Sequence, residues 1–279
     1  MTILTFSILL LFFSLLAGLL GALTGLGGGI IVIPVLVVLF KVDIHYAMGA
    51  SLISVIATSS GAAVAYMRDG YTNIRIGVYL EVAAVLGALT GALLISVMPK
   101  SVIAILFSGI LFISSYMTLQ RHEDQEGYSM SHPWAKALKL DGRYPHQKNQ
   151  IQSYHVQRAP LGLFLMGIAG LLSGLLGIGS GSLKVLAMDQ ALRLPYKVAT
   201  TTSNFMIGIT AATSAGIYFD RGYINPAITF PVMIGVLAGS FLGAKILPRI
   251  HIYALRVIFS IVICLIGVQM LYQTFTGQI

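Results

Sequence analysis

Apolar stretches near twenty residues long recur along the whole sequence, each bounded by charged residues or by proline and glycine. A helix needs about 20 apolar residues to cross the hydrocarbon core of a bilayer. Of the 279 residues, 57% are hydrophobic and only 9% are charged, whereas soluble domains carry roughly 25%. The runs are continuous rather than alternating, which argues against a β-barrel. The sequence therefore predicts an all-α polytopic membrane protein.

We expect about 8–10 hydrophobic segments, read from continuous apolar runs. They lie at about 3–24, 29–40, 46–66, 74–96 and 101–119, and then at 159–177, 182–193, 197–218, 223–246 and 252–274. Two of them, 29–40 and 182–193, are too short to cross a bilayer as helices. Each of the two follows a glycine cluster, so each is expected to be a half-helix after a break.

The two halves of the sequence repeat. When Gly27 is placed over Gly179, an offset of 152 (179 − 27), GLLGALTGLGGG falls on GLLSGLLGIGSG without a gap. At the same offset YMRDGYTN falls on YFDRGYIN. An ungapped match of this length indicates internal duplication. We expect three parts: an N-terminal transmembrane repeat at 1–120, a linker at 121–158 and a C-terminal transmembrane repeat at 159–279.

The distribution of Lys and Arg gives an orientation, since cytoplasmic loops collect positive charge. With the N-terminus outside, most basic residues, the linker's included, fall on the inner side, and the outer side receives Lys41, Lys100 and Arg221. The predicted location is the plasma (inner) membrane, with a cytoplasmic linker and inverted repeats. The net charge of +8 then reflects basic loops, and no nucleic-acid partner is expected.

The linker contains a candidate β-hairpin. SYHVQR (153–158) alternates and can pair with a strand near Gly142–Pro145 across the polar HQKNQ turn. An ordered connector is favoured over a regulatory domain. The linker histidines lack a clear metal spacing, the single Cys264 excludes an intramolecular disulfide, and nothing resembles a nucleotide-binding loop. We therefore expect no metal, no cofactor and no ATP coupling.

The glycine clusters are the first candidate site. A break at membrane depth frees backbone N–H groups that must face protein or a water-filled cavity, and the half-helix that follows points its N-terminus there. Amide donors and the helix dipole favour an anion. The candidate ligands are Gly27, Gly28, Gly29, Gly179, Ser180 and Gly181. The alternative is helix packing, which we favour for Gly87/Gly91 and Gly239/Gly243.

A polar layer forms the second candidate. Thr201, Thr202, Ser203 and Asn204 follow the second half-helix, and Ser51 is the repeat mate of Ser203. Their neutral donors suit the oxygens of an oxyanion. The alternative is that the hydroxyls bond to the backbone of their own helix.

Three ionisable residues lie inside apolar segments, where such residues mark functional sites by default. Lys184 would add positive charge to the anion site, or would form an ion pair with Asp189 or Glu81 that only holds helices together. Glu81 is a candidate to carry a coupling proton, and Asp189 is a second candidate. The alternative for Glu81, slightly favoured, is snorkelling to the inner interface.

GLGGGIIVIPVL followed by GASLIS, repeated as GIGSGSLKVL and TTTSNF, resembles the TauE/SafE sulfite-exporter-like family of anion transporters. The RDGYTN and DRGYIN turns and the connector ending YHVQRAPLG are similar too. The resemblance implies a membrane carrier that moves sulfite, organosulfonates or related small anions, generally outward. It places one half-site at Gly27–Gly29 with Ser51. It places the other at Gly179 and Gly181 with Ser203 and Asn204.

The sequence departs from that pattern in its second half. Ser180 stands where the first half has Gly28, Leu186 stands where it has Pro34, and the half-helix adds Lys184 and Asp189. The expected function is secondary anion transport by alternating access, with possible proton coupling, and not an enzyme activity. An anion channel of the same fold, a membrane sulfur-handling enzyme and a signalling partner protein are the alternatives. The expected partners are a small anion and the lipid bilayer, and a homo-oligomer is left open.

Overall fold

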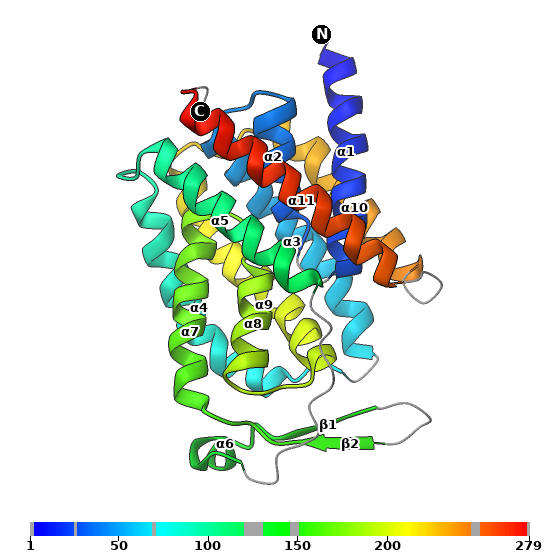
Figure 1. Cartoon of the computed structure of the whole chain (residues 1–279), viewed down its shortest axis with the longest axis vertical. Helices are drawn as coiled ribbons and strands as arrows, with labels where there is room; N and C mark the ends of the chain where they lie inside the picture. Colours follow the sequence, from blue (N-terminus) through cyan, green and yellow to red (C-terminus); the bar gives the residue numbers. More distant parts are fainter. Residues whose placement is uncertain are drawn as a thin grey trace.

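A computed structural model describes residues 3–24, 27–68, 71–119, 131–145, 151–246 and 252–277. In these ranges the molecule is a bundle of helices with one small hairpin (Figure 1). Both ends of the chain lie at the end of the bundle opposite the hairpin (Figure 1). The expected boundary between residues 120 and 121 lies outside the described residues.

The helices of the first half follow the predicted apolar segments. They are α1 (Ile3–Thr24), α2 (Gly29–Pro34), the π-helix η1 (Val35–Leu39), α3 (Ile44–Arg68), α4 (Ile74–Leu94) and α5 (Lys100–Leu119). Pro34 has no N–H to donate, so the α-helical ladder cannot continue through it unchanged. The chain widens into η1, where the N–H of Phe40 donates to the C=O of Val35.

The second half repeats this order with one difference. It contains α7 (Ala159–Leu176), α8 (Gly181–Gln190), α9 (Tyr196–Asp220), α10 (Pro226–Ile246) and α11 (Ile252–Phe275). The half-helix α8 has Leu186 at the position of Pro34 and stays α-helical throughout. Among the described helices, α1, α4, α5, α7 and α10 are long and apolar enough to cross a membrane. The predicted all-α polytopic membrane fold is confirmed.

Helices pack in pairs that combine the two halves. α1 packs along α10, and α4 packs along α7. A methyl group added at Gly87 would overlap the C=O of Gly167, and one at Gly239 would overlap the C=O of Leu15. These two contacts are equivalent at the offset of 152 residues. The packing role of Gly87 and Gly239 is confirmed, and the duplication gains support, while the inverted relation of the repeats stays a prediction.

Apolar side chains on the outside of the bundle mark the surface that faces lipid. Val78 and Val82 lie one turn apart on α4 and are 54% and 60% exposed. Phe230 and Ile234, at the equivalent positions of α10, are 60% and 52% exposed. Rows of exposed apolar side chains on opposite halves are what a bilayer requires of a spanning protein.

The linker forms a small unit at one end of the bundle (Figure 1). It contains α6 (Pro133–Ala137), β1 (Gly142–Pro145) and β2 (Ile151–Tyr154). The strands pair antiparallel, with Gly142 opposite Tyr154. β2 begins and ends earlier than the alternating stretch 153–158, because the N–H of Val156 donates to the Asp141 carboxylate rather than to a strand.

Candidate functional site

The two glycine breaks lie against each other in the centre of the bundle. Gly27 and Gly179 have φ of 81° and 70°, a left-handed conformation that glycine adopts without strain. A methyl group added at Gly179 would lie 2.7 Å from a methyl carbon of Val55 on α3. One added at Gly29 would lie 3.5 Å from the C=O of Ile178. The sequence prediction that the breaks converge matches this arrangement.

The N-terminus of α8 leaves amide donors without helical partners. The first α-helical bond runs from the N–H of Lys184 to the C=O of Ser180, at 3.0 Å. The amides of residues 181–183 therefore have no acceptor within the helix. Ser180 adopts the left-handed conformation and does not cap the helix. Its hydroxyl donates instead to the C=O of Ala169, at 2.6 Å.

The first half-helix likewise begins with amides that have no helical acceptor, in a shorter element. Gly28 precedes α2 without a side-chain cap, and its C=O accepts from the amides of Ile31 and Val32. The amides of Gly29 and Ile30 come before these bonds and have no acceptor inside the helix. The break residues 27–29 and 179–181 are all buried.

Three hydroxyls of the polar layer donate to backbone carbonyls. Ser51 donates to Gly177 at 2.8 Å, and Ser203 donates to Gly181 at 3.1 Å. Thr201 donates to Lys197 on its own helix at 2.9 Å, as the alternative reading of this cluster expects. A hydroxyl has one hydrogen to donate. In this conformation these three side chains do not offer that hydrogen to an anion.

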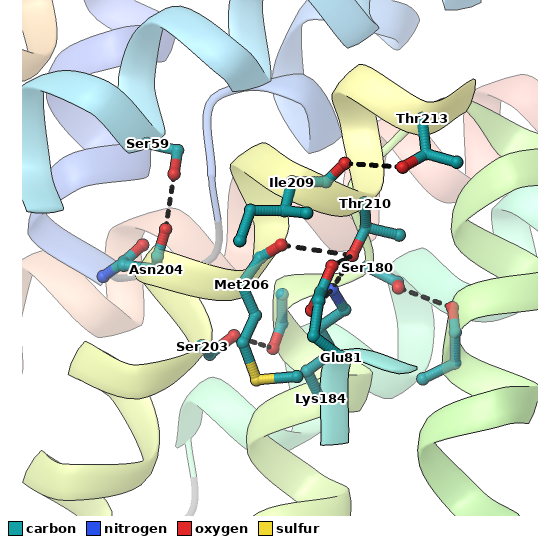
Figure 2. Close-up of polar contacts among 12 residues, drawn as sticks. Ser59, Glu81, Ser180, Lys184, Ser203, Asn204, Met206, Ile209, Thr210 and Thr213 are labelled. Atoms are coloured by element: carbon teal, nitrogen blue, oxygen red, sulfur yellow. Dashed lines mark hydrogen bonds and ion pairs between the residues drawn. The ribbon is translucent and has the colours of Figure 1, made fainter. Parts of the chain in front are cut away.

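Asn204 differs from its neighbours. Its side chain is 2% exposed, and its Nδ2 has no hydrogen-bond partner among the described residues. Its backbone C=O accepts from the Ser59 hydroxyl at 2.5 Å, which ties α9 to α3 (Figure 2). A buried amide donor without an acceptor is costly. It is also the kind of group that a bound anion would satisfy.

Thr202 connects this layer to the linker. Its hydroxyl oxygen accepts from the N–H of Asn73 at 3.1 Å, and the Asn73 side chain donates to the C=O of Leu140 and to the hydroxyl of Tyr154. Asn73 was not predicted as a functional residue from the sequence. Its position before α4, in the repeated turn YTN, was the available signal.

Lys184 and Glu81 form an ion pair inside the bundle. Lys184 is fully buried and Glu81 is 6% exposed, and Nζ lies 3.5 Å from Oε2. The sequence left Asp189 and Glu81 open as partners, and the structure pairs Lys184 with Glu81. The burial of Glu81 runs against the favoured snorkelling alternative, because its carboxylate turns inward to Lys184. Asp189 is buried further along α8, where Gln190 donates to it at 3.2 Å.

Thr210 on α9 joins this pair and was missed in the sequence. Its hydroxyl accepts from Nζ of Lys184 and has two acceptors within reach of its one hydrogen, Oε1 of Glu81 at 2.5 Å and the C=O of Met206 at 3.1 Å (Figure 2). The nearer acceptor is Glu81. One signal was available, because Thr210 follows Ser203 by seven residues and so lies on the same face of a helix. The described residues contain no group of three or more His, Cys, Asp and Glu side chains that could hold a metal ion.

Comparisons with known proteins agree on one family. Residues 10–270 match the family model described as Sulfite exporter TauE/SafE. The chain is 29% identical to Probable membrane transporter protein YunE of Bacillus subtilis, over 95% of this chain and 97% of the relative. It is 28% identical to Probable membrane transporter protein YdhB of the same organism, over 84% and 89%. A probable membrane transporter protein of Methanocaldococcus jannaschii is 26% identical over 94% of each chain. No solved structure matches.

Proposed function

The chain belongs to the TauE/SafE sulfite exporter family, and from that premise we propose that it is a secondary transporter of sulfite, an organosulfonate or a related small anion. The anion binds between the N-termini of α2 and α8 and crosses by alternating access. The proposed orientation in the inner membrane has the N-terminus outside and the linker in the cytoplasm. The observation that carries the proposal is the meeting of two uncapped half-helix ends in a buried centre.

The donor set supports an anion rather than a cation. Amides of residues 29–30 and 181–183 have no helical acceptor, and the N-terminal end of a helix carries partial positive charge. The unpartnered Nδ2 of Asn204 adds a neutral donor on α9. Backbone amides with a side-chain amide recognise oxygens bound to sulfur or carbon by hydrogen bonds alone.

Burial favours a carrier over a channel. A channel needs a continuous pathway, whereas the break residues of both half-helices are buried. Access must then alternate, with the two sides opening in turn. The direction of net movement follows from the gradients and from any coupled ion, and an outward flow of sulfite is the role that the family's description gives.

Binding of anions to the purified protein tests the proposal. We expect a sulfur oxyanion or a sulfonate to raise the melting temperature in detergent, because a ligand that binds only the folded state stabilises it. Asn204→Ala removes an Nδ2 that has no partner among the described residues. We expect this variant to keep its fold and to bind the anion about tenfold more weakly, since a hydrogen bond to a charged group contributes roughly 1.5–3 kcal/mol.

Two variants complete the experiment. Gly28→Leu places a side chain where a single added carbon would already lie 3.1 Å from Val236, and it should abolish stabilisation by the anion. Gly109→Leu is the control, since a side chain there meets nothing within 4 Å. The proposal is wrong if no anion stabilises the wild-type protein, or if Gly28→Leu and Asn204→Ala, both folded, bind the anion as the wild type does.

A further inference from the structure

We propose that Glu81, Lys184 and Thr210 form a proton-linked charge switch. A proton on Glu81 frees the positive charge of Lys184 for the anion, and loss of the proton returns Lys184 to Glu81. Proton and anion then cross in the same direction. This inference rests on the proposed anion transport and names what is coupled to it.

The duplication supplies an internal comparison for these three residues. At the offset of 152 residues, Lys184 corresponds to Val32, Thr210 to Thr58 and Glu81 to Met233. Val32 is buried in the first half-helix without a charge, and the Thr58 hydroxyl donates to Ser54 on its own helix. The helices at these three equivalent positions therefore repeat the arrangement without an ion pair. Packing alone does not require these two charges.

The energetic cost of burying charges also favours a functional role for this ion pair. Removing two charges from water is expensive, and a buried ion pair often stabilises no better than apolar residues of similar volume. Within apolar segments an ionisable pair marks a functional site. Because the equivalent positions, Val32 and Met233, carry no such pair, a role in transport explains it better than a role in stability.

The geometry lets the pair exchange partners. Oε1 of Glu81 accepts from Thr210, while Oε2 has no hydrogen-bond donor among the described residues and faces Nζ at 3.5 Å. Oε2 is therefore the oxygen that takes the proton. Lys184 lies one turn after Ser180, and helical side chains lean toward the N-terminus of their helix, which is where the proposed anion binds.

Charge is balanced in both states. Without the anion, ionised Glu81 neutralises Lys184. With the anion, a proton from water binds Oε2 to give a neutral carboxylic acid, and the negative charge of the anion neutralises Lys184. Thr210 contacts both charged groups and remains as a partner for Lys184 when Glu81 is neutral. The buried centre thus never carries an unpaired charge, which would be costly there.

Other titratable groups lie on the helices that surround the pair. On α4, Arg75 donates to the C=O of Lys139 and Tyr79 to that of Ala159. α7 has no titratable side chain within Ala159–Leu176, and on α9 Lys197 lies over the Tyr71 ring. The remaining groups on packed helices are Asp189 on α8, Tyr196, Tyr218 and Asp220 on α9, and Lys100 and Tyr116 on α5. In the described part of the chain, the charge acting on Glu81 comes from Lys184 and the reverse.

The test uses full-length protein in liposomes that contain a pH-sensitive dye. An inward gradient of isethionate is imposed, because a sulfonate stays ionised near neutral pH and brings no proton of its own. We expect wild-type protein to take up isethionate and to acidify the lumen. Glu81→Gln should take up isethionate without acidification, because the amide cannot accept the proton. Met233→Gln places the same side chain at the equivalent position and should keep the wild-type ratio of protons to anions.

A second variant guards against misfolding of Glu81→Gln. Glu81→Met with Lys184→Val copies the residues at the equivalent positions, Met233 and Val32, and should fold, bind isethionate about tenfold more weakly and move no protons. The inference is overturned if wild-type protein moves isethionate without a pH change, or if either variant acidifies the lumen as the wild type does. If the wild type moves and binds neither isethionate nor sulfite, the proposed function itself fails.

Discussion

The hydroxyl of Ser51 donates a hydrogen bond to the backbone C=O of Gly177, at a distance of 2.8 Å, and so joins the two halves of the chain at the centre of the bundle. Ser51 lies on α3, and Gly177 ends α7 in a left-handed conformation. Both residues are buried. The first half thereby fixes the turn that leads into the glycine break of the second half.

Ser51→Ala should therefore destabilise the protein more than its size suggests. The change leaves a buried carbonyl without its donor, at a cost of about 1–3 kcal/mol. Ser54→Ala is the matched control, since among the described residues the Ser54 hydroxyl bonds to the C=O of Ser51 on its own helix. Thermal unfolding in detergent measures both variants. Equal losses of melting temperature in the two variants would show that the Ser51–Gly177 contact stabilises the protein no more than the Ser54 bond does.

Gly29→Ala should disturb the same centre by crowding. The added methyl carbon would lie 2.5 Å from the Ser51 hydroxyl and 2.6 Å from Val55. Overpacking of this kind costs about 1–3 kcal/mol, and it pushes α3 away from the half-helix. Gly109→Ala, with nothing within 4 Å, should leave the melting temperature unchanged. A Gly29→Ala variant as stable as Gly109→Ala would mean that α3 yields without strain.

Asn73→Ala should uncouple the linker from the bundle. Asn73 caps α4 by accepting from the N–H of Ile76, and loss of such a cap costs about 1 kcal/mol. The variant also loses the bonds to Leu140 and Tyr154. Asn73→Asp keeps the cap and loses the two donors. Faster proteolysis of the linker in both variants, with full destabilisation only in Asn73→Ala, is the expected pattern. Wild-type cleavage rates in both would contradict it.

The linker should loosen in acid because of Asp141. Burial raises the pKa of Asp141, but hydrogen bonds from Ser131 and from the N–H of Val156, with His155 nearby, outweigh it and leave the pKa below its usual value. A carboxylate with a lowered pKa stabilises the folded state above its unfolded pKa. That stabilisation is lost as the pH falls below about 4.

Emission from the single tryptophan, Trp134, reports this change, because it lies in α6 of the linker. We expect a shift in acid for the wild type. Asp141→Asn should show the shifted emission already at neutral pH. Asp43→Asn, which alters a carboxylate in the loop before α3, serves as the control and should behave as the wild type. An identical acid profile for wild type and Asp141→Asn would exclude Asp141 as the cause.

Single and double replacements of the ion pair should not add. Lys184→Val alone leaves Glu81 buried without its partner, and breaking a buried pair costs about 3–5 kcal/mol. Replacing both residues, as Glu81→Met with Lys184→Val, removes both charges and should cost less than the single change. A double-mutant cycle on melting temperatures measures the coupling. Additive losses would show that the two charges do not interact in the folded protein.

Local sequence patterns predicted most of the helices, because apolar length and glycine or proline breaks act over short distances. The short segments 29–40 and 182–193 became α2 with η1, and α8. The π-helical widening after Pro34 was not predicted. The loss of one backbone N–H at Pro34 is compatible with several backbone conformations, and the sequence alone does not determine which of them forms.

The candidate site was predicted less completely, for a physical reason. Gly27–Gly29 and Gly179–Gly181 could be located because a glycine break is a local signal. The partners of polar side chains depend on contacts between residues far apart in the sequence. Glu81 and Lys184 lie on different helices of different halves, and a hydroxyl such as that of Ser203 or Thr201 can reach several carbonyls. Which one it reaches is decided by packing that no single stretch encodes.

The paired helices have a mechanical consequence. At α4–α7 and α1–α10, backbones touch through Gly87, Gly170, Gly18 and Gly239, so neither pair can shear without a steric collision. Each pair is therefore a rigid unit that contains one helix from each half of the chain. In the proposed alternating access, the movement is then expected between the two pairs, where α3 packs against α9. A motion of one half of the chain relative to the other would first have to separate the helices of both pairs.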